Sequence, residues 1–167
     1  MQIEVLVDGE GLADVAAISL PHGAPGRELI AAVAARGGFP AEEAFLFVED
    51  EDEELDIAVL VVDERLSGRV HHVHRAKWIE VEVFYMGNDK KKEFRPAARV
   101  QRVLDWAVGP HGFNIDPTIA PEMELALHGH TEALPKNAHI GRFVHHPHHG
   151  LALDLIRGVV PNWLMRC

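Results

Sequence analysis

The chain has 167 residues, with 47% hydrophobic and 25% charged residues and a formal net charge of −10. These proportions are typical of a folded globular protein, and the excess of negative charge argues against nucleic acid or an anionic membrane as the main partner. The single cysteine, Cys167, excludes an intramolecular disulfide, and the sequence shows neither a membrane-spanning apolar run nor a signal peptide, so we expect a cytoplasmic protein.

The first half of the chain has the patterns of a small α+β domain. Residues 2–7 alternate apolar and polar side chains, as a half-buried strand does. Residues 26–36 repeat apolar side chains at helical spacing, and Gly37-Gly38 supplies a helix stop. In chain order we expect strands at 2–7 and 14–20, a helix at 26–36, and strands at 44–48, 57–62 and 70–74.

The second half repeats this order with a period of about 76 residues. In chain order we expect strands at 79–85 and 91–95, a helix at 99–108, and strands at 123–127 and 151–156. Hairpin, helix and further strands is the order of a β-grasp domain. We therefore expect an α+β protein of two tandem β-grasp domains, each a mixed sheet wrapped over one helix, at 1–76 and 77–158, with a C-terminal tail at 159–167. The short junction Arg75-Ala76-Lys77 predicts a restricted orientation between them.

Twelve histidines raise the question of a metal site, above all in the run His145-His146-Pro147-His148-His149. Zinc accepts imidazole ligands, but adjacent histidines point in divergent directions and Pro147 prevents a helix that would align them. The spacing matches no closed metal site, so we predict an ordinary loop and no metal. In the last strand of the first half, His71, His72 and His74 alternate, and we expect His72 to face away from its two neighbours.

The strongest charge run is Glu49–Glu54, with Asp56 just beyond it. This run lacks the Asp-x-Asp-x-Asp-Gly order of a calcium loop, which excludes an EF-hand. Closely spaced like charges repel one another and favour a solvated loop. We expect a solvated loop, with docking to a basic face of a partner enzyme as the alternative.

No catalytic arrangement is recognisable in the sequence. The chain lacks a Gly-x-Ser-x-Gly motif, a phosphate-binding loop and a His-Glu-x-x-His motif. Small β-grasp domains also offer little concave volume for chemistry. We therefore predict that the protein is not an enzyme and has no cofactor of its own.

Three segments carry a resemblance to a known family. They are Val70–Arg75, His139-Ile140-Gly141, and the last strand Leu151–Gly158, which alternates leucines with other residues and ends in Arg-Gly. In this order they resemble the bacterial tandem ubiquitin-like modifiers, which have two ubiquitin-like β-grasp domains. The resemblance implies conjugation to target proteins in anti-phage defence, with phage structural proteins among the candidate targets. It also implies three partners: an activating enzyme that uses ATP, a conjugating enzyme and a JAMM-type metalloprotease.

The tail departs from that of ubiquitin, which ends in Gly-Gly. A Gly-Gly end suits the narrow channel of an activating enzyme, because glycine has no side chain to clash with it. Here the chain continues past Gly158 to Cys167. The conjugation terminus is therefore either the intact Cys167 carboxylate, which we favour, or Gly158 after proteolytic processing. For partner binding we expect the outward side chains of the last strand and apolar side chains of the tail: Ala152, Asp154, Ile156, Arg157, Trp163 and Leu164.

Two other functions stay open at this point. The first is a non-conjugated β-grasp scaffold that self-associates through a strand edge. The second is a sulfur carrier with a terminal thiocarboxylate, although such carriers normally have one domain and a Gly-Gly end. Incubation with the activating and conjugating enzymes and ATP separates these hypotheses, because only a modifier forms adducts with other proteins.

Overall fold

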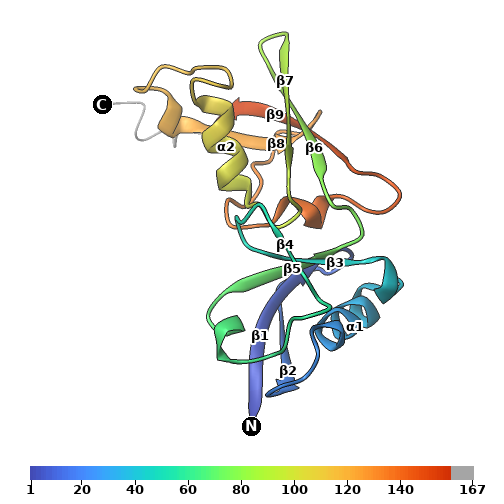
Figure 1. Cartoon of the computed structure of the whole chain (residues 1–167). Helices are drawn as coiled ribbons and strands as arrows, with labels where there is room; N and C mark the ends of the chain where they lie inside the picture. The colour runs from blue at the N-terminus through green and yellow to red at the C-terminus, as the bar shows by residue number, and fades with distance from the viewer. Residues whose placement is uncertain (159–167) are drawn as a thin grey trace.

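The computed structural model describes residues 1–158, which form two units with one β-sheet and one α-helix each. We call β1 to β5 with α1 the N-terminal unit and β6 to β9 with α2 the C-terminal unit. The units lie end to end, and the N-terminus is at the end remote from the C-terminal unit (Figure 1). The predicted domain boundaries at residues 76 and 158 stay predictions.

The N-terminal unit has a five-stranded sheet in the order β2-β1-β5-β3-β4. Strand β1 pairs antiparallel with β2 and parallel with β5, and β3 pairs antiparallel with β5. Its elements are β1 (Gln2–Gly9), β2 (Ala16–Pro21), α1 (Gly26–Gly37), β3 (Phe45–Val48), β4 (Glu54–Leu55) and β5 (Val70–His74).

The C-terminal unit has a four-stranded sheet in the order β7-β6-β9-β8. Strand β6 pairs antiparallel with β7 and parallel with β9, and β8 pairs antiparallel with β9. A short 3-10 helix, Ile140–Phe143, lies in the long connection before β9. The other elements are β6 (Ile79–Tyr85), β7 (Asn88–Phe94), α2 (Val100–Val108), β8 (Met123–Leu127) and β9 (Gly150–Arg157).

Each unit has its own apolar core between the sheet and its helix. In the N-terminal unit, Val5 and Val7 from β1 pack with Leu29 and Val33 from α1. The C-terminal core includes Leu151, Leu153 and Leu155 from β9, together with side chains of β6 and α2. Two separate cores and two mixed sheets give an α+β structure that is compatible with tandem β-grasp domains.

The predicted strand at 57–62 is wrong. Residues 57–59 form a turn that the Asp56 carboxylate caps by accepting a hydrogen bond from Ala58 N. Farther on, Leu60 O accepts from Gly26 N and Val62 N donates to Ala24 O, so this apolar segment packs at the start of α1. The fourth strand is instead β4, and the predicted partner strands at 14–20 and 91–95 lie at Ala16–Pro21 and Asn88–Phe94. Among the described residues, no helix is long and apolar enough to cross a membrane.

Candidate functional site

Strand β9 lies between β6 and β8 and has one buried and one open face. Its leucines at 151, 153 and 155 point into the core, as the period-2 alternation predicts. On the opposite face Ala152 is exposed, while Asp154 and Ile156 are half-buried, and Arg157 is exposed at the end of the strand. Four of the six residues predicted for partner binding thus lie together along one strand.

Two residues that the sequence analysis missed belong to the same face. The ring of Phe84 in β6 lies 4.4 Å, centroid to centroid, from the ring of His128, which follows β8. His128 Nδ1 lies 2.7 Å from Asp154 Oδ1, and Gly129 N donates to Asp154 Oδ2 at 2.9 Å. Partial burial raises the pKa of Asp154, but these two hydrogen bonds outweigh it and hold the pKa below its usual range. For Phe84, the sequence did contain a signal. It is an aromatic residue at an outward position of β6, whose other outward residues, Glu80 and Glu82, are charged.

The chain is held to the sheet up to the last described residue. Gly158 N donates to Glu122 O at 2.7 Å, and the Arg157 guanidinium pairs with the Glu122 carboxylate. A side chain at 158 would approach Glu122 O and the Glu124 carboxylate to 3.1 and 3.3 Å, closer than most side-chain contacts. Cys167, Trp163 and Leu164, the other predicted site residues, lie outside the described residues.

The outer face of β5, in contrast, is buried against the C-terminal unit. His72 and His74 lie on this face with their rings stacked at 5.7 Å, and both are fully buried. The prediction that His72 faces away from both neighbours is therefore wrong, because residues two apart in a strand share a face. Only His71 is on the opposite face, where it is buried with neither ring nitrogen hydrogen-bonded.

His74 anchors the junction through backbone groups of both units. Its Nδ1 lies 2.9 Å from Ala76 N, which donates to it, so the ring proton is on Nε2. Nε2 lies 2.7 Å from Val144 O and 3.1 Å from Gly141 O and donates to these carbonyl groups. Burial lowers the pKa of His74, while the carbonyl contacts and nearby Glu10 partly offset this effect. The neutral ring fits this bonding pattern.

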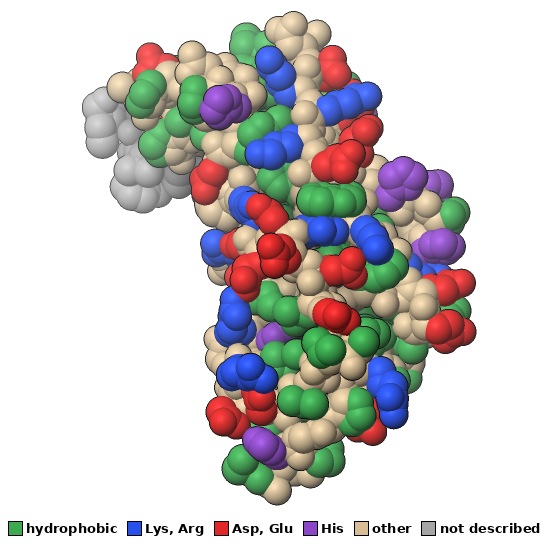
Figure 2. Space-filling view, viewed as in Figure 1, with side chains coloured by type: hydrophobic (Ala, Val, Ile, Leu, Met, Phe, Trp, Pro, Cys, Tyr) green, Lys and Arg blue, Asp and Glu red, His purple; other side chains and the backbone are tan. Residues whose placement is uncertain are grey.

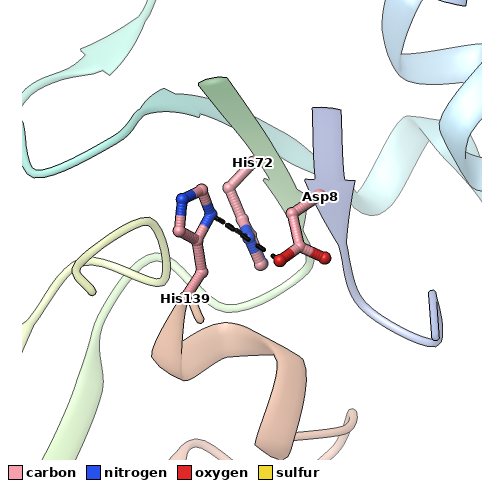
Figure 3. A group of neighbouring side chains, drawn as sticks. All are labelled: Asp8, His72 and His139. Carbon is pink, nitrogen blue, oxygen red and sulfur yellow. Dashed lines mark hydrogen bonds and ion pairs between the residues drawn. The ribbon is translucent and has the colours of Figure 1, made fainter. Parts of the chain in front are cut away.

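A second cluster joins the units around His139, which precedes the 3-10 helix. His139 Nδ1 lies 3.0 Å from His72 Nδ1 and 4.0 Å from Asp8 Oδ2 (Figure 3). On its other side, His139 Nε2 lies 3.2 Å from Glu49 Oε2. Arg142 Nη2 donates to Asp8 Oδ2 at 2.8 Å. Burial is the main cause that lowers the pKa of His72, and the neighbouring histidines and Arg142 lower it further.

Glu10 adds an ion pair at the same junction. Its carboxylate accepts from Arg75 Nη2 at 2.6 Å and from His146 N at 2.9 Å. Burial on its own would raise the pKa of Glu10, but these hydrogen bonds outweigh it and lower the pKa from 4.5 to about 2. The charged carboxylate thus links β1, the connection between the units and the loop before β9.

The acidic run was expected to be a solvated loop, but the structure shows it only partly solvated. Asp50 accepts hydrogen bonds from Arg99 N and Arg99 Nε, and its own carbonyl accepts from Arg102 Nη1. Arg102 also pairs with Asp52, and Arg95 Nε donates to the Asp52 carbonyl at 2.6 Å. Acidic and basic side chains interleave across the middle of the molecule, where the units meet (Figure 2). The basic face that this run contacts is on the C-terminal unit of the same chain.

The run His145–His149 is an exposed loop before β9. Within residues 1–158, the group of side chains arranged like metal ligands is a different one: Asp8, His72 and His139. The prediction of an ordinary loop for the run therefore agrees with its exposure, whereas the buried group was not predicted from the sequence.

In the comparison with protein-family models, a match covers the C-terminal unit. Residues 80–158 match the model described as BilA ubiquitin-like domain 2. This match supports a relationship to bacterial ubiquitin-like proteins and agrees with the mixed sheet and single helix of that unit. No curated protein matches the chain.

Proposed function

We propose that this protein is a ubiquitin-like modifier whose C-terminal carboxylate is adenylated, passed on as a thioester and joined to target proteins. The observation that carries the proposal is the arrangement of β9 within the unit that resembles BilA ubiquitin-like domain 2. The strand is fixed by pairing on both sides, its outer face is open, and residues 159–167 follow it in the sequence. A reactive tail needs such a rigid base beside a surface that enzymes can recognise.

The chemistry of the proposal takes place on the tail rather than in the fold. The Cys167 carboxylate attacks the α-phosphate of ATP on the activating enzyme, and pyrophosphate leaves. A cysteine thiolate of that enzyme then displaces AMP, which forms a thioester that the conjugating enzyme takes over by thiol exchange. Finally a lysine amine of the target displaces the thiolate and forms an isopeptide bond. If a protease first removes residues 159–167, Gly158 takes the place of Cys167.

The partners in this proposal are an activating enzyme, a conjugating enzyme and a JAMM-type metalloprotease, with anti-phage defence as the biological setting. The side chains of Ala152, Asp154, Ile156 and Arg157 form the part of the partner surface that the structure describes, and we add Phe84. Their common position on β9, which ends just before Gly158, and on the neighbouring β6 supports this assignment, because an enzyme that holds the tail must bind near Gly158.

The direct test incubates the full chain with its activating and conjugating enzymes, Mg²⁺ and ATP. We expect adducts of higher mass on denaturing gels, with an enzyme-bound form that thiols cleave. α,β-Methylene ATP is the matched control, since it binds like ATP but cannot release pyrophosphate. If neither the full chain nor a chain ending at Gly158 gives ATP-dependent adducts, the proposal fails.

Trypsin then identifies the terminus, because an arginine precedes each candidate. Cleavage after Arg166 leaves a single cysteine on the target lysine, whereas cleavage after Arg157 in a processed chain leaves a single glycine. We expect the cysteine remnant by mass spectrometry. A glycine remnant would instead assign Gly158 as the terminus and a trimming step to the protease.

The partner surface is tested with Ile156→Arg. This substitution changes the open face of β9 and leaves the buried leucines in place, so we expect an unchanged melting temperature and at least a tenfold slower transfer to the conjugating enzyme. Glu42→Arg, on an exposed position of the N-terminal unit, is the matched control and should transfer normally. Normal transfer by Ile156→Arg would remove this face from the proposal.

The scaffold alternative receives less support from the sheet edges. The exposed edge strand β7 carries Lys90, Lys91 and Lys92, and lysines on an edge strand oppose pairing with a second copy. Self-association through this edge would also be visible as a concentration-dependent mass in solution.

A further inference from the structure

Three ligand-type side chains from separate elements meet inside the junction between the units. Asp8 is near the end of β1, His72 is in β5, and His139 precedes the 3-10 helix of the C-terminal unit (Figure 3). One oxygen or ring nitrogen from each lies within 4.8 Å of those of the other two, and all three residues are buried. We propose that Asp8, His72 and His139 form a binding site for a zinc-class divalent metal ion that joins the two units.

The hydrogen bonds around the histidines leave lone pairs directed at this site. His139 Nε2 faces the Glu49 carboxylate at 3.2 Å, so it carries the proton and Nδ1 carries the lone pair. A carboxylate in this position is the usual outer partner of a metal-bound histidine. His72 Nδ1 faces this lone pair at 3.0 Å, and two ring nitrogens so close need a proton or a cation between them.

No other group fixes the proton of His72. Its Nε2 is buried without a hydrogen-bond partner, beside Gly141, where any side chain would clash with that nitrogen. Nε2 is therefore unsatisfied whether or not it carries the ring proton, so it does not fix the tautomer, and Nδ1 offers its lone pair to a cation when the proton is on Nε2. A buried polar atom with no partner costs free energy. Because His72 has this cost in both of its neutral forms, its ring proton can move between the two nitrogens more readily than that of His139.

The charges around the site also favour a cation. The carboxylates of Asp8, Glu49 and Asp50 face two guanidinium groups, those of Arg142 and Arg99, which leaves an excess of one negative charge. Arg142 binds Asp8 Oδ2, and Asp8 Oδ1 accepts from Gly9 N, so the Asp8 carboxylate is held in place from both oxygens. An ion at the site would share Oδ2 with Arg142, which holds that oxygen beside His139.

Ligand type and spacing point to zinc rather than calcium or magnesium. Two imidazoles and one carboxylate are a typical zinc set, whereas calcium and magnesium prefer oxygen ligands alone. In tetrahedral coordination with Zn–N distances of about 2.0–2.1 Å, two ligand nitrogens lie about 3.4 Å apart. The two Nδ1 atoms are already at 3.0 Å, and Asp8 Oδ2 needs to approach His139 Nδ1 by less than 1 Å from its 4.0 Å separation.

The site would act as a clamp on the orientation of the units. Two ligands belong to the N-terminal unit and one to the C-terminal unit, so a bound ion ties the connection before β9 to β1 and β5. This role is independent of the proposed conjugation, because none of the three residues lies on the open face of β9.

Cobalt(II) is the probe, because it replaces zinc and gives visible absorption that depends on its coordination number. The metal-stripped full chain is titrated with Co²⁺ at neutral pH, and its melting temperature is followed in parallel. We expect one Co²⁺ per chain, strong absorption of a four-coordinate ion without thiolate charge-transfer bands, and a melting temperature that rises with Co²⁺ concentration.

Two sets of variants separate the site from other ligands of the chain. In His139→Gln we expect the absorption to be lost, and in Glu49→Gln we expect Co²⁺ affinity to fall about 10- to 100-fold with the band positions unchanged. Cys167→Ser, and a variant with all four histidines of the His145–His149 run replaced by Gln, should bind as the unchanged chain does. Glu49→Gln keeps all three ligands and therefore remains informative if His139→Gln does not fold.

The proposal is overturned if the unchanged chain shows no stoichiometric four-coordinate absorption. It is equally overturned if folded His139→Gln binds normally, or if the cysteine or loop variants lose binding, since other residues would then hold the ion.

Discussion

Strands β5 and β9 occupy equivalent positions in the two sheets and use their outer faces in opposite ways. Each pairs parallel with the first strand of its unit and antiparallel with the strand that follows the helix, which is β3 for β5 and β8 for β9. Both direct apolar side chains inward, Val73 in β5 and the leucines in β9. Outward, β5 has His72 and His74 buried against the other unit, whereas β9 has Ala152 exposed and Asp154 half-buried.

This difference indicates how a repeated unit acquires separate roles. The N-terminal unit has its sheet face covered by its neighbour, so that face is not available for other proteins. The C-terminal unit keeps the same face open next to the end of the chain. Partner recognition by this strand is therefore expected only on the C-terminal unit, and the following predictions test that asymmetry.

The largest effect is expected inside the core of β9. Leu153→Ala removes a fully buried side chain and should lower the free energy of unfolding of the C-terminal unit by about 2–5 kcal/mol, measured by denaturant titration. Ala152→Ser, its neighbour on the open face, should change it by no more than about 0.5 kcal/mol. Similar costs at both positions would mean that β9 has no open face.

An intermediate effect is expected on the outer face of β5. His74→Ala leaves the Val144 and Gly141 carbonyls and the Ala76 amide without their partner, at a cost of about 2–3 kcal/mol. The units should also separate, with a larger radius of gyration by X-ray scattering. His128→Ala, on the open face of the C-terminal unit, should leave the radius unchanged; a compact His74→Ala would contradict a junction held by β5.

The smallest effect concerns the charge on the open face of β9. We expect the pKa of Asp154 by NMR to lie below its usual range and to rise in His128→Gln, which lacks the charged form of that partner. Because the pKa is lower in the folded state, this contribution to stability is present above the unfolded pKa and is lost as pH falls through the folded pKa. His111→Gln, elsewhere on the surface, is the control, and an equal shift there would exclude a local cause.

Local patterns were enough to predict most of the strands and both helices. The alternating leucines of β9 predicted its inward face because burial in a sheet has a period of two. The segment 57–62 has equally apolar residues, but it packs at the start of α1. Hydrophobicity alone does not distinguish a buried strand from an apolar segment that packs against a helix. Asp56, which directly precedes that segment and caps the turn, was the polar signal.

The junction between the units could not be predicted from local patterns. His72 and His139 meet although they are distant in sequence, and only the placement of the two sheets brings them together. The acidic run and its basic partners did leave a signal: Arg95 and Arg99 precede α2, and Arg102 lies in its first turn. Opposite charges in two halves of a repeat suggest an internal contact as readily as an external one.

The parallel pairing of β6 with β9 has a mechanical consequence. The register runs from Glu80 opposite Gly150 to Phe84 opposite Asp154, so the start of β6 and the end of β9 lie at opposite ends of the shared ladder. Tension between the connection to the N-terminal unit and Gly158 therefore loads all of these hydrogen bonds together in shear, instead of opening them one at a time. The C-terminal unit would therefore resist unravelling when it is pulled in that direction.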